Sequence, residues 1–278
     1  MAGPAGPLPA PRHAPGPDGP WEQVREELAA TGSCVLYGTL ATWSAHLQEP
    51  ERLRPVLGRD WSRYESLTPA RGKERFLASR VLLRQTAAAA IGTVPELVDL
   101  AYHPGGRPYV RGCDQIDISL SHTEEVLVVG VTSRGRIGVD VELADRRMAG
   151  TASETQGYTT FELARLDEEP ASRRNDLLVR LWTLKEAYSK ALGVGLRFRF
   201  TEFGFALDGR RGARLVQPDG EPVAGGSAWS FATFGVRSRY VVSLAVFDAG
   251  FGGSSDLSVD TALDEGLLDT LLRATERS

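Results

Sequence analysis

LVRLWTLKEAYSKALGVGL, residues 178–196, has the spacing of a helix that stops at a pair of glycines. At 100° per residue, one stripe collects the apolar side chains of Leu177, Leu181, Leu184, Tyr188 and Ala191. Gly193 and Gly195 fit a helix stop, because a left-handed backbone costs little only for glycine. The pattern predicts a helix from about Asp176 to Leu192 whose apolar stripe faces the core.

The face opposite this stripe carries Glu186, with Trp182 one turn before it and Lys190 one turn after it. An exposed Glu–Lys pair at this spacing would stabilise the helix by only about 0.2–0.5 kcal/mol. A tryptophan on an outward face instead indicates that another segment or a ligand covers it. Both interpretations stay open from the helix alone, and Lys185, nearer the edge of the stripe, fits a structural role.

A second stretch, RIGVDVEL at residues 136–143, alternates as a strand does. Asp140 and Glu142 then share one face, while Val139, Val141 and Leu143 pack behind it. Two carboxylates about 7 Å apart repel each other unless a positive charge lies between them. The pattern fits either a Mg²⁺ site with oxygen ligands or a strand with a solvated acidic face.

Two further stretches carry polar groups at the ends of predicted strands. DISLSHTEE, residues 117–125, places Ser121 and His122 side by side, where adjacent strand residues face opposite ways. This makes a poor catalytic dyad, whereas a hydroxyl and an imidazole suit phosphate binding; a structural histidine is the alternative. YHPGGRPYV, residues 102–110, contains a Gly-Gly-Arg-Pro turn whose one cation is Arg107.

The rest of the chain predicts an α+β fold of two similar halves in a pseudo-twofold arrangement, each with a long helix on a small antiparallel sheet. In the first half, apolar residues at helical spacing run through residues 72–92 and end at Gly92. The segments with strand patterns are residues 116–120, 124–133, 137–143, 198–207, 227–235 and 240–247. We expect a disordered Pro/Gly-rich leader over residues 1–20 and two halves at 21–135 and 136–250. An acidic tail follows at 251–278, and its leucine spacing predicts a helix.

Composition excludes several classes of protein. Of 278 residues, 42% are hydrophobic and 24% charged, as in ordinary globular proteins. The net charge of −4 gives no general attraction to nucleic acid or to an anionic membrane. Two cysteines without metal-type spacing favour a reducing, cytoplasmic setting. No run approaches the roughly 20 apolar residues that span a bilayer.

The order of these motifs is more specific than any one of them. A Gly-basic-Pro turn, Ser-x-Ser-His, Gly-x-Asp-x-Glu and Trp-x-x-Lys-Glu-Ala-x-x-Lys follow one another over residues 106–195. In this order the chain resembles the 4′-phosphopantetheinyl transferases of the larger, pseudo-dimeric, surfactin-synthetase-activating type. The resemblance implies transfer of the 4′-phosphopantetheine arm of coenzyme A to a serine of an acyl or peptidyl carrier protein, with adenosine 3′,5′-bisphosphate as the other product.

The resemblance also implies roles for the acidic and basic residues. Asp140, Glu142 and Glu186 would hold Mg²⁺, or Mn²⁺ in its place, and Lys190 would bind phosphate oxygens. Either Glu186 or a metal-bound water would be the general base. Ser121, His122 and Arg107, which replaces the family's usual lysine, would contact coenzyme A. The candidates for the 3′-phosphate are Arg63 and Arg75.

The expected partner is a carrier domain of fatty-acid, polyketide or peptide biosynthesis, docked on residues 144–166. Arg146 and Arg147 would face its acidic surface, with Tyr158 or Phe161 adding apolar contact. We expect a monomer, because one chain supplies both walls of the cleft. Two alternatives are a non-catalytic module that binds coenzyme A or a carrier protein, and a metal-dependent phosphodiesterase that removes the arm.

Overall fold

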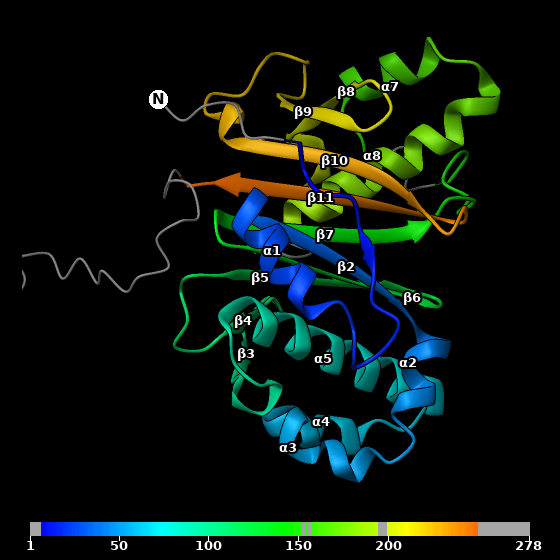
Figure 1. Cartoon of the computed structure of the whole chain (residues 1–278). Helices are drawn as coiled ribbons and strands as arrows, with labels where there is room; N and C mark the ends of the chain where they lie inside the picture. The colour runs from blue at the N-terminus through cyan, green and yellow to red at the C-terminus, as the bar shows by residue number, and fades with distance from the viewer. Residues whose placement is uncertain (1–6, 152–153, 155–156, 194–198, 250–278) are drawn as a thin grey trace, which may run out of the picture.

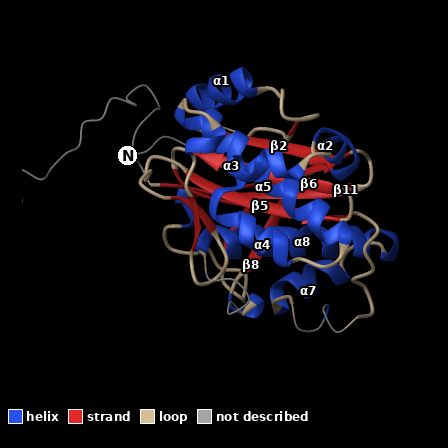
Figure 2. Cartoon of the chain, turned by 90° about the horizontal axis from the view of Figure 1, so that it is seen from below, coloured by secondary structure: helices blue, strands red, loops and turns tan. Residues whose placement is uncertain are grey.

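The chain folds into four layers, helix on sheet on sheet on helix, in a computed structural model that describes residues 7–151, 154, 157–193 and 199–249. Helix α5 (Ala70–Ile91) covers the outer face of a four-stranded sheet, and helix α8 (Ala171–Leu192) covers the outer face of a five-stranded sheet. Figure 2 shows the strands gathered between the helices. The predicted α+β class, with its small, mainly antiparallel sheets, is confirmed; the pseudo-twofold relation and the domain boundaries stay predictions.

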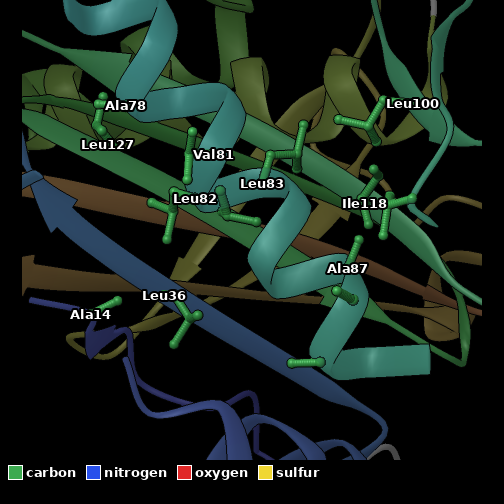
Figure 3. Close-up of a cluster of buried hydrophobic side chains, with 14 of the residues drawn as sticks. Ala14, Leu36, Ala78, Val81, Leu82, Leu83, Ala87, Leu100, Ile118 and Leu127 are labelled. Carbon is green, nitrogen blue, oxygen red and sulfur yellow. The ribbon is translucent and has the colours of Figure 1, made fainter. Parts of the chain in front are cut away.

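The four-stranded sheet has the order β1-β2-β6-β5. Its strands are β1 (Arg12–His13), β2 (Ser33–Thr39), β6 (Val126–Thr132) and β5 (Asp117–Thr123), antiparallel except for β1 on β2. Their alternating side chains separate two cores: Leu36 and Leu127 pack under α5, while Val35 and Val128 face the other sheet. In Figure 3, Val81 and Leu82 of α5 lie over Leu36 and Leu127.

The five-stranded sheet has the order β7-β11-β10-β9-β8 and is antiparallel throughout. Its strands are β7 (Gly135–Leu143), β11 (Tyr240–Asp248), β10 (Trp229–Val236), β9 (Gly212–Val216) and β8 (Gly204–Asp208). Val139 and Val141 of β7 pack against the first sheet, as the alternation predicts. The opposite face of β7 is therefore free to carry Asp140 and Glu142 toward α8.

Smaller elements complete the described part of the chain. The helices are α1 (Trp21–Thr31), α2 (Leu40–His46), α3 (Arg54–Leu57), α4 (Trp61–Ser66) and α7 (Thr160–Asp167). The 3-10 turns are η1 (Pro50–Leu53), η2 (Gly58–Asp60), η3 (Pro95–Leu97), η5 (Phe200–Glu202) and η6 (Gly226–Ala228). A hairpin of β3 (Leu100–Tyr102) and β4 (Pro108–Val110) carries the Gly-Gly-Arg-Pro turn. None of the helices in these ranges combines the length and apolar character needed to cross a bilayer.

Both predicted long helices are present and end as the sequence indicates. The capping glycines, Gly92 after α5 and Gly193 after α8, have φ values of 69° and 74°. In this left-handed region a side chain with a Cβ would be strained. Gly195, the second glycine of the predicted stop, lies outside the described residues.

The two sheets meet along a seam between β5 and β7, where side chains take the place of a backbone ladder. Three alternate side chains of β5, those of Asp117, Ser119 and Ser121, each accept a hydrogen bond from a backbone N–H of β7. The bonds, donor first, are Ile137 to Asp117 at 2.7 Å, Val139 to Ser119 at 3.1 Å and Val141 to Ser121 at 3.3 Å. These bonds satisfy edge N–H groups of β7 and set its register on β5.

The prediction of a disordered leader over residues 1–20 is wrong for the segment around β1. β1 pairs with β2, and Ala14 is fully buried, with its carbonyl accepting a 2.8 Å hydrogen bond from Trp43 Nε1. A segment rich in Pro, Gly and Ala is ordered here because it gains backbone bonds at a sheet edge and covers an existing core. The predicted tail at 251–278 lies outside the described residues.

Gly138 is the point at which β7 and α8 come closest. A Cβ at this position would lie 1.8 Å from the carbonyl oxygen of Ala187 and 2.6 Å from the backbone nitrogen of Ala191. Both atoms belong to a helix backbone that cannot move alone, so the glycine allows the approach that places α8 beside the acidic face of β7.

We expect Gly138→Ala to lower the free energy of unfolding by about 1–3 kcal/mol or more, because overpacking here forces a strand and a helix apart. Urea unfolding measures the change. Gly235→Ala is the matched control, since Gly235 lies in a strand of the same sheet and its Cβ would meet nothing within 4 Å. Equal stability of the two variants would show that the close approach is not required.

Candidate functional site

A cleft of about 270 Å³ opens between the Gly-Gly-Arg-Pro turn, β5 and the last turns of α8. Motifs that are far apart in the sequence form its walls. Arg107 and Ser119 lie on one side, and Glu186 and Lys190 lie on the other. A side pocket of about 260 Å³ adjoins it and is lined by Arg80, Ser121, His122 and Lys190, among others. We call these two hollows the central cleft and the side pocket.

Asp140, Ser121 and Lys190 form a closed triangle of hydrogen bonds between β7, β5 and α8. Lys190 Nζ donates to Asp140 Oδ1 at 2.6 Å and to Ser121 Oγ at 2.9 Å. Ser121 Oγ donates in turn to Asp140 Oδ1 at 2.9 Å. The seam brings these residues together from positions 121, 140 and 190, and the bond of Val141 to Ser121 holds the hydroxyl in place.

Glu142 is held by its neighbours on the same edge. One carboxylate oxygen accepts from the backbone N–H of Leu143 at 2.9 Å and from Thr123 Oγ1 at 3.3 Å. The other pairs with Arg146, whose guanidinium lies over the ring of Trp182, 5.3 Å from its centroid. This cation, together with an edge contact from Phe200, covers the tryptophan that the helix pattern places on its outward face.

Glu186 faces the same edge but is bound in neither ion pair. Burial raises the pKa of its carboxyl, as do the negative charges of Asp140 and Glu142, while Lys190 and Arg146 lower it. The three carboxylates are therefore close enough to interact. The interpretation of Glu186 and Lys190 as a plain solvated pair is wrong, because Lys190 forms its 2.6 Å ion pair with Asp140.

The acidic edge has the donor chemistry of a hard-cation site. All three side chains offer carboxylate oxygens, which Mg²⁺ prefers, and the charges of Asp140 and Glu142 add to burial in raising the pKa of Glu186. Within the described ranges, no three His, Cys, Asp or Glu side chains are close enough together to hold a metal ion. Lys190 and Arg146 neutralise Asp140 and Glu142 in this arrangement.

His122 lies at the side pocket among positive charges. Although its side chain is exposed, desolvation and the charges of Arg75, Lys190 and Arg80 lower its pKa to about 4. The imidazole is thus neutral near pH 7, and the three cations around it favour an anion. Among the residues that the structure describes, the buried Nε atoms of Arg75 and Arg80 find no hydrogen-bond partner.

The residues predicted to bind coenzyme A do not all lie at the side pocket. Ser121 and His122 line the side pocket, and Arg75 lies close enough to lower the pKa of His122. Arg63 is exposed on α4 and lies over the ring of Phe76, 5.7 Å from its centroid. Arg107 lines the central cleft, but its guanidinium pairs with Asp117 and donates to the carbonyl of Ile137 at 2.9 Å.

Sequence reasoning missed Arg80. It lies on α5 and lines the side pocket, with its guanidinium between the rings of Phe76 and Tyr102. The available signal was an arginine inside the apolar run FLASRVLL, residues 76–83, where a cation needs a partner or a ligand.

Lys185 has the structural role that its position suggested. It is fully buried, forms a 2.9 Å ion pair with Glu162 and donates to the carbonyls of Phe200 and Phe203 at 2.6 Å each. This network ties α7 and the segment before β8 to α8, one residue before Glu186.

The predicted docking segment, residues 144–166, is described except at 152–153 and 155–156. Tyr158 does not form an exposed contact surface, contrary to expectation: it is 2% exposed, and its hydroxyl donates to the carbonyl of Leu178. The side chain packs inward because it completes the core beneath α8. Phe161 is half-buried, and Arg146 is bound to Glu142.

Comparison with known proteins gives a consistent result. The family model described as the 4′-phosphopantetheinyl transferase superfamily matches residues 136–245. A 4′-phosphopantetheinyl transferase of Paxillus involutus is 30% identical over 220 residues, which cover 69% of this chain and 75% of that protein. A phosphopantetheinyl transferase of Thraustochytrium is 28% identical, with 74% and 76% covered. A 4′-phosphopantetheinyl transferase of Bacillus subtilis is 26% identical over 147 residues, with 52% of this chain and 64% of the relative covered.

Proposed function

We propose roles in catalysis for the residues of the central cleft from the premise that this chain belongs to the 4′-phosphopantetheinyl transferase superfamily and is a transferase of that type. Its reaction moves the 4′-phosphopantetheine arm of coenzyme A to a carrier protein. The observation that carries the assignment is that Lys190, which lines the central cleft together with Glu186, donates hydrogen bonds to Asp140 of β7 and Ser121 of β5.

Asp140, Glu142 and Glu186 would hold Mg²⁺ in this proposal. The support is the oxygen-only donor set and the raised pKa of Glu186, which burial and then the negative charge of Asp140 cause. Bound there, the ion would neutralise the charge on the pyrophosphate. The three carboxylates are not grouped closely enough in the described part of the chain to hold an ion as they stand, and Lys190 and Arg146 neutralise Asp140 and Glu142. Binding therefore requires the carboxylates to converge and these cations to turn toward the substrate phosphates.

Glu186 is proposed to take the proton from the attacking serine hydroxyl, directly or through one water. The serine oxygen forms a bond to the phosphorus of the phosphopantetheine arm, and the bond from that phosphorus to the bridging oxygen breaks. The leaving group is adenosine 3′,5′-bisphosphate, which keeps the bond electrons. A raised pKa makes Glu186 a stronger base than an ordinary carboxylate, and Lys190 stabilises the departing charge.

The side pocket is proposed to bind phosphate groups of coenzyme A. Ser121 and neutral His122 supply hydrogen bonds, while Arg75, Arg80 and Lys190 supply positive charge. Arg63 and Arg107 stay candidates: the first is exposed near this wall, and the second must leave Asp117 to reach a phosphate.

Residues 144–166 remain the proposed docking segment for a carrier domain, with the exposed Arg147 as its cation and Phe161 as its apolar contact. Action by a single chain is likewise a proposal, supported by the two walls of the cleft that one chain provides.

The reaction is tested by incubating the protein with coenzyme A, Mg²⁺ and an apo carrier protein, and by separating the nucleotide products. A transferase releases adenosine 3′,5′-bisphosphate in proportion to holo carrier. Binding of coenzyme A without this product would favour the non-catalytic module. Release of the free arm from a holo carrier would favour the phosphodiesterase.

A further inference from the structure

A buried carboxylate lies behind the side pocket. Asp60 is 4% exposed and ends η2, directly before α4. Its Oδ2 accepts a hydrogen bond from the hydroxyl of Tyr102 at 2.9 Å and another from Arg84 Nη2 at 3.3 Å. Its Oδ1 lies 4.0 Å from Arg80 Nε, which is an ion pair but not a hydrogen bond.

The two arginines that meet Asp60 differ in what else they bind. Arg84 is 2% exposed and also donates to the carbonyls of Leu57 and Val98, so its guanidinium belongs to the core. Arg80 lines the side pocket, and its buried Nε has no hydrogen-bond partner within the described ranges. The carboxylate of Asp60 can neutralise only one of the two guanidinium groups, so the cluster has a net charge of +1. Arg80 places this positive charge at the side pocket.

Tyr102 completes the support of Arg80. Its ring faces the guanidinium, 5.2 Å from the ring centroid, while Phe76 lies on the guanidinium at 4.8 Å. Burial raises the pKa of the Tyr102 hydroxyl to about 12, so it stays protonated and donates to Asp60. Asp60 thus acts on Arg80 in two ways. Its charge attracts the guanidinium directly, and its hydrogen bond fixes the Tyr102 ring that the guanidinium contacts.

We propose that Asp60 is a positioning residue that, with Tyr102, holds Arg80 at the side pocket so that Arg80 binds a phosphate group of the nucleotide. This inference rests on the proposed function. The inference adds two residues to the proposed site. Asp60 lies outside both hollows, and Arg80 is the arginine that the sequence pattern did not indicate. The 3′-phosphate and the pyrophosphate share the chemistry that Arg80 would recognise.

The test is Asp60→Asn, measured by calorimetric binding of adenosine 3′,5′-bisphosphate and by steady-state transfer. Loss of the negative charge alone would strengthen anion binding, because the pocket becomes more positive. If Asp60 positions Arg80, its loss instead weakens anion binding. We expect the Kd for the bisphosphate and the KM for coenzyme A to rise about tenfold, the effect of losing one charge-assisted hydrogen bond from Arg80 to a phosphate. The kcat at saturating coenzyme A should be little changed.

Three further variants complete the test. Tyr102→Phe keeps the ring but removes the hydroxyl, so a smaller rise in the same direction is expected, and it serves if Asp60→Asn fails to fold. Arg80→Met should weaken bisphosphate binding at least as much, and Asp60→Glu should restore part of it. Repeating the series with 3′-dephospho-coenzyme A distinguishes the phosphates: an effect that vanishes assigns Arg80 to the 3′-phosphate, and one that persists assigns it to the pyrophosphate.

Unchanged or tighter binding by a folded Asp60→Asn protein would overturn the positioning role, as would unchanged binding by Arg80→Met. Failure of the proposed function looks different: the wild-type protein itself would then bind neither the bisphosphate nor coenzyme A.

Discussion

Replacing Glu186 with glutamine is expected to lower kcat for carrier modification by about 10²–10⁴-fold, the usual contribution of a general base. The substitution keeps the size of the side chain and removes its ability to take a proton, and it also replaces one of the three carboxylates proposed to hold Mg²⁺, so the assays are run at saturating Mg²⁺. Coenzyme A should still bind, because Arg75, Arg80 and His122 on the opposite wall are untouched. Stopped assays at saturating coenzyme A, with binding measured separately by calorimetry, separate the two effects.

The pH dependence gives this prediction a second readout. Glu186 must be ionised to act, and its pKa lies above the ordinary value, chiefly because of burial and Asp140. Activity should therefore be present above the raised pKa and should fall as the pH decreases through it. Added Mg²⁺ lowers that pKa and moves the acid limb to lower pH. The acid limb should disappear in the glutamine variant.

Glu168→Gln is the matched control, because Glu168 is exposed and pairs only at the surface with Arg165. It should leave kcat unchanged. A Glu186→Gln protein that retained transfer within tenfold of the wild type, with the same acid limb, would remove Glu186 from the role of base.

Replacing Lys185 with methionine is expected to lower the free energy of unfolding by about 3–5 kcal/mol, because it leaves Glu162 as an unpaired buried charge. Methionine has nearly the same length and fills the same space. The carbonyls of Phe200 and Phe203 also lose their donor. Urea unfolding followed by circular dichroism measures the loss.

The surface pair Arg165–Glu168 provides the comparison. Its side chains are 66% and 63% exposed, so Arg165→Met should change stability by no more than about 1 kcal/mol. A second variant that also replaces Glu162 with glutamine should recover part of the Lys185→Met loss, since no buried charge is then left unpaired. A Lys185→Met loss as small as that of Arg165→Met would show that the pair does not stabilise the fold.

The elements with strong periodicity could be predicted from the sequence. Helix α8 and strand β7 follow the expected patterns, and Asp140 and Glu142 share the face that alternation assigns them. Local pattern suffices there because each element buries one side. β2 was not predicted, although it is almost wholly buried and lies in the middle of the first sheet.

The contacts within the site could not be predicted in the same way. The triangle of Ser121, Asp140 and Lys190 depends on the register of β5 against β7, which side chains set across the seam. Arg107 pairs with Asp117, ten residues further along the chain. The residues around each of them in the sequence do not indicate this ion pair. The family resemblance supplied the set of residues; the structure supplies their partners.

The leader and Arg80 show two opposite errors. Composition alone indicated disorder before residue 20, but an exposed strand edge can order a short segment through backbone bonds. Arg80 lies in an apolar run, and its role appears only when η2 and β3 bring Asp60 and Tyr102 beside it. Both outcomes depend on packing between segments distant in the sequence.

The most direct test of the proposed catalysis is the intact mass of an apo carrier protein after incubation with this protein, coenzyme A and Mg²⁺. We expect a gain of one phosphopantetheine arm, absent when the acceptor serine of the carrier is replaced by alanine and lost when the metal is chelated. An unchanged mass across acyl and peptidyl carriers, under conditions where coenzyme A is bound, would contradict it.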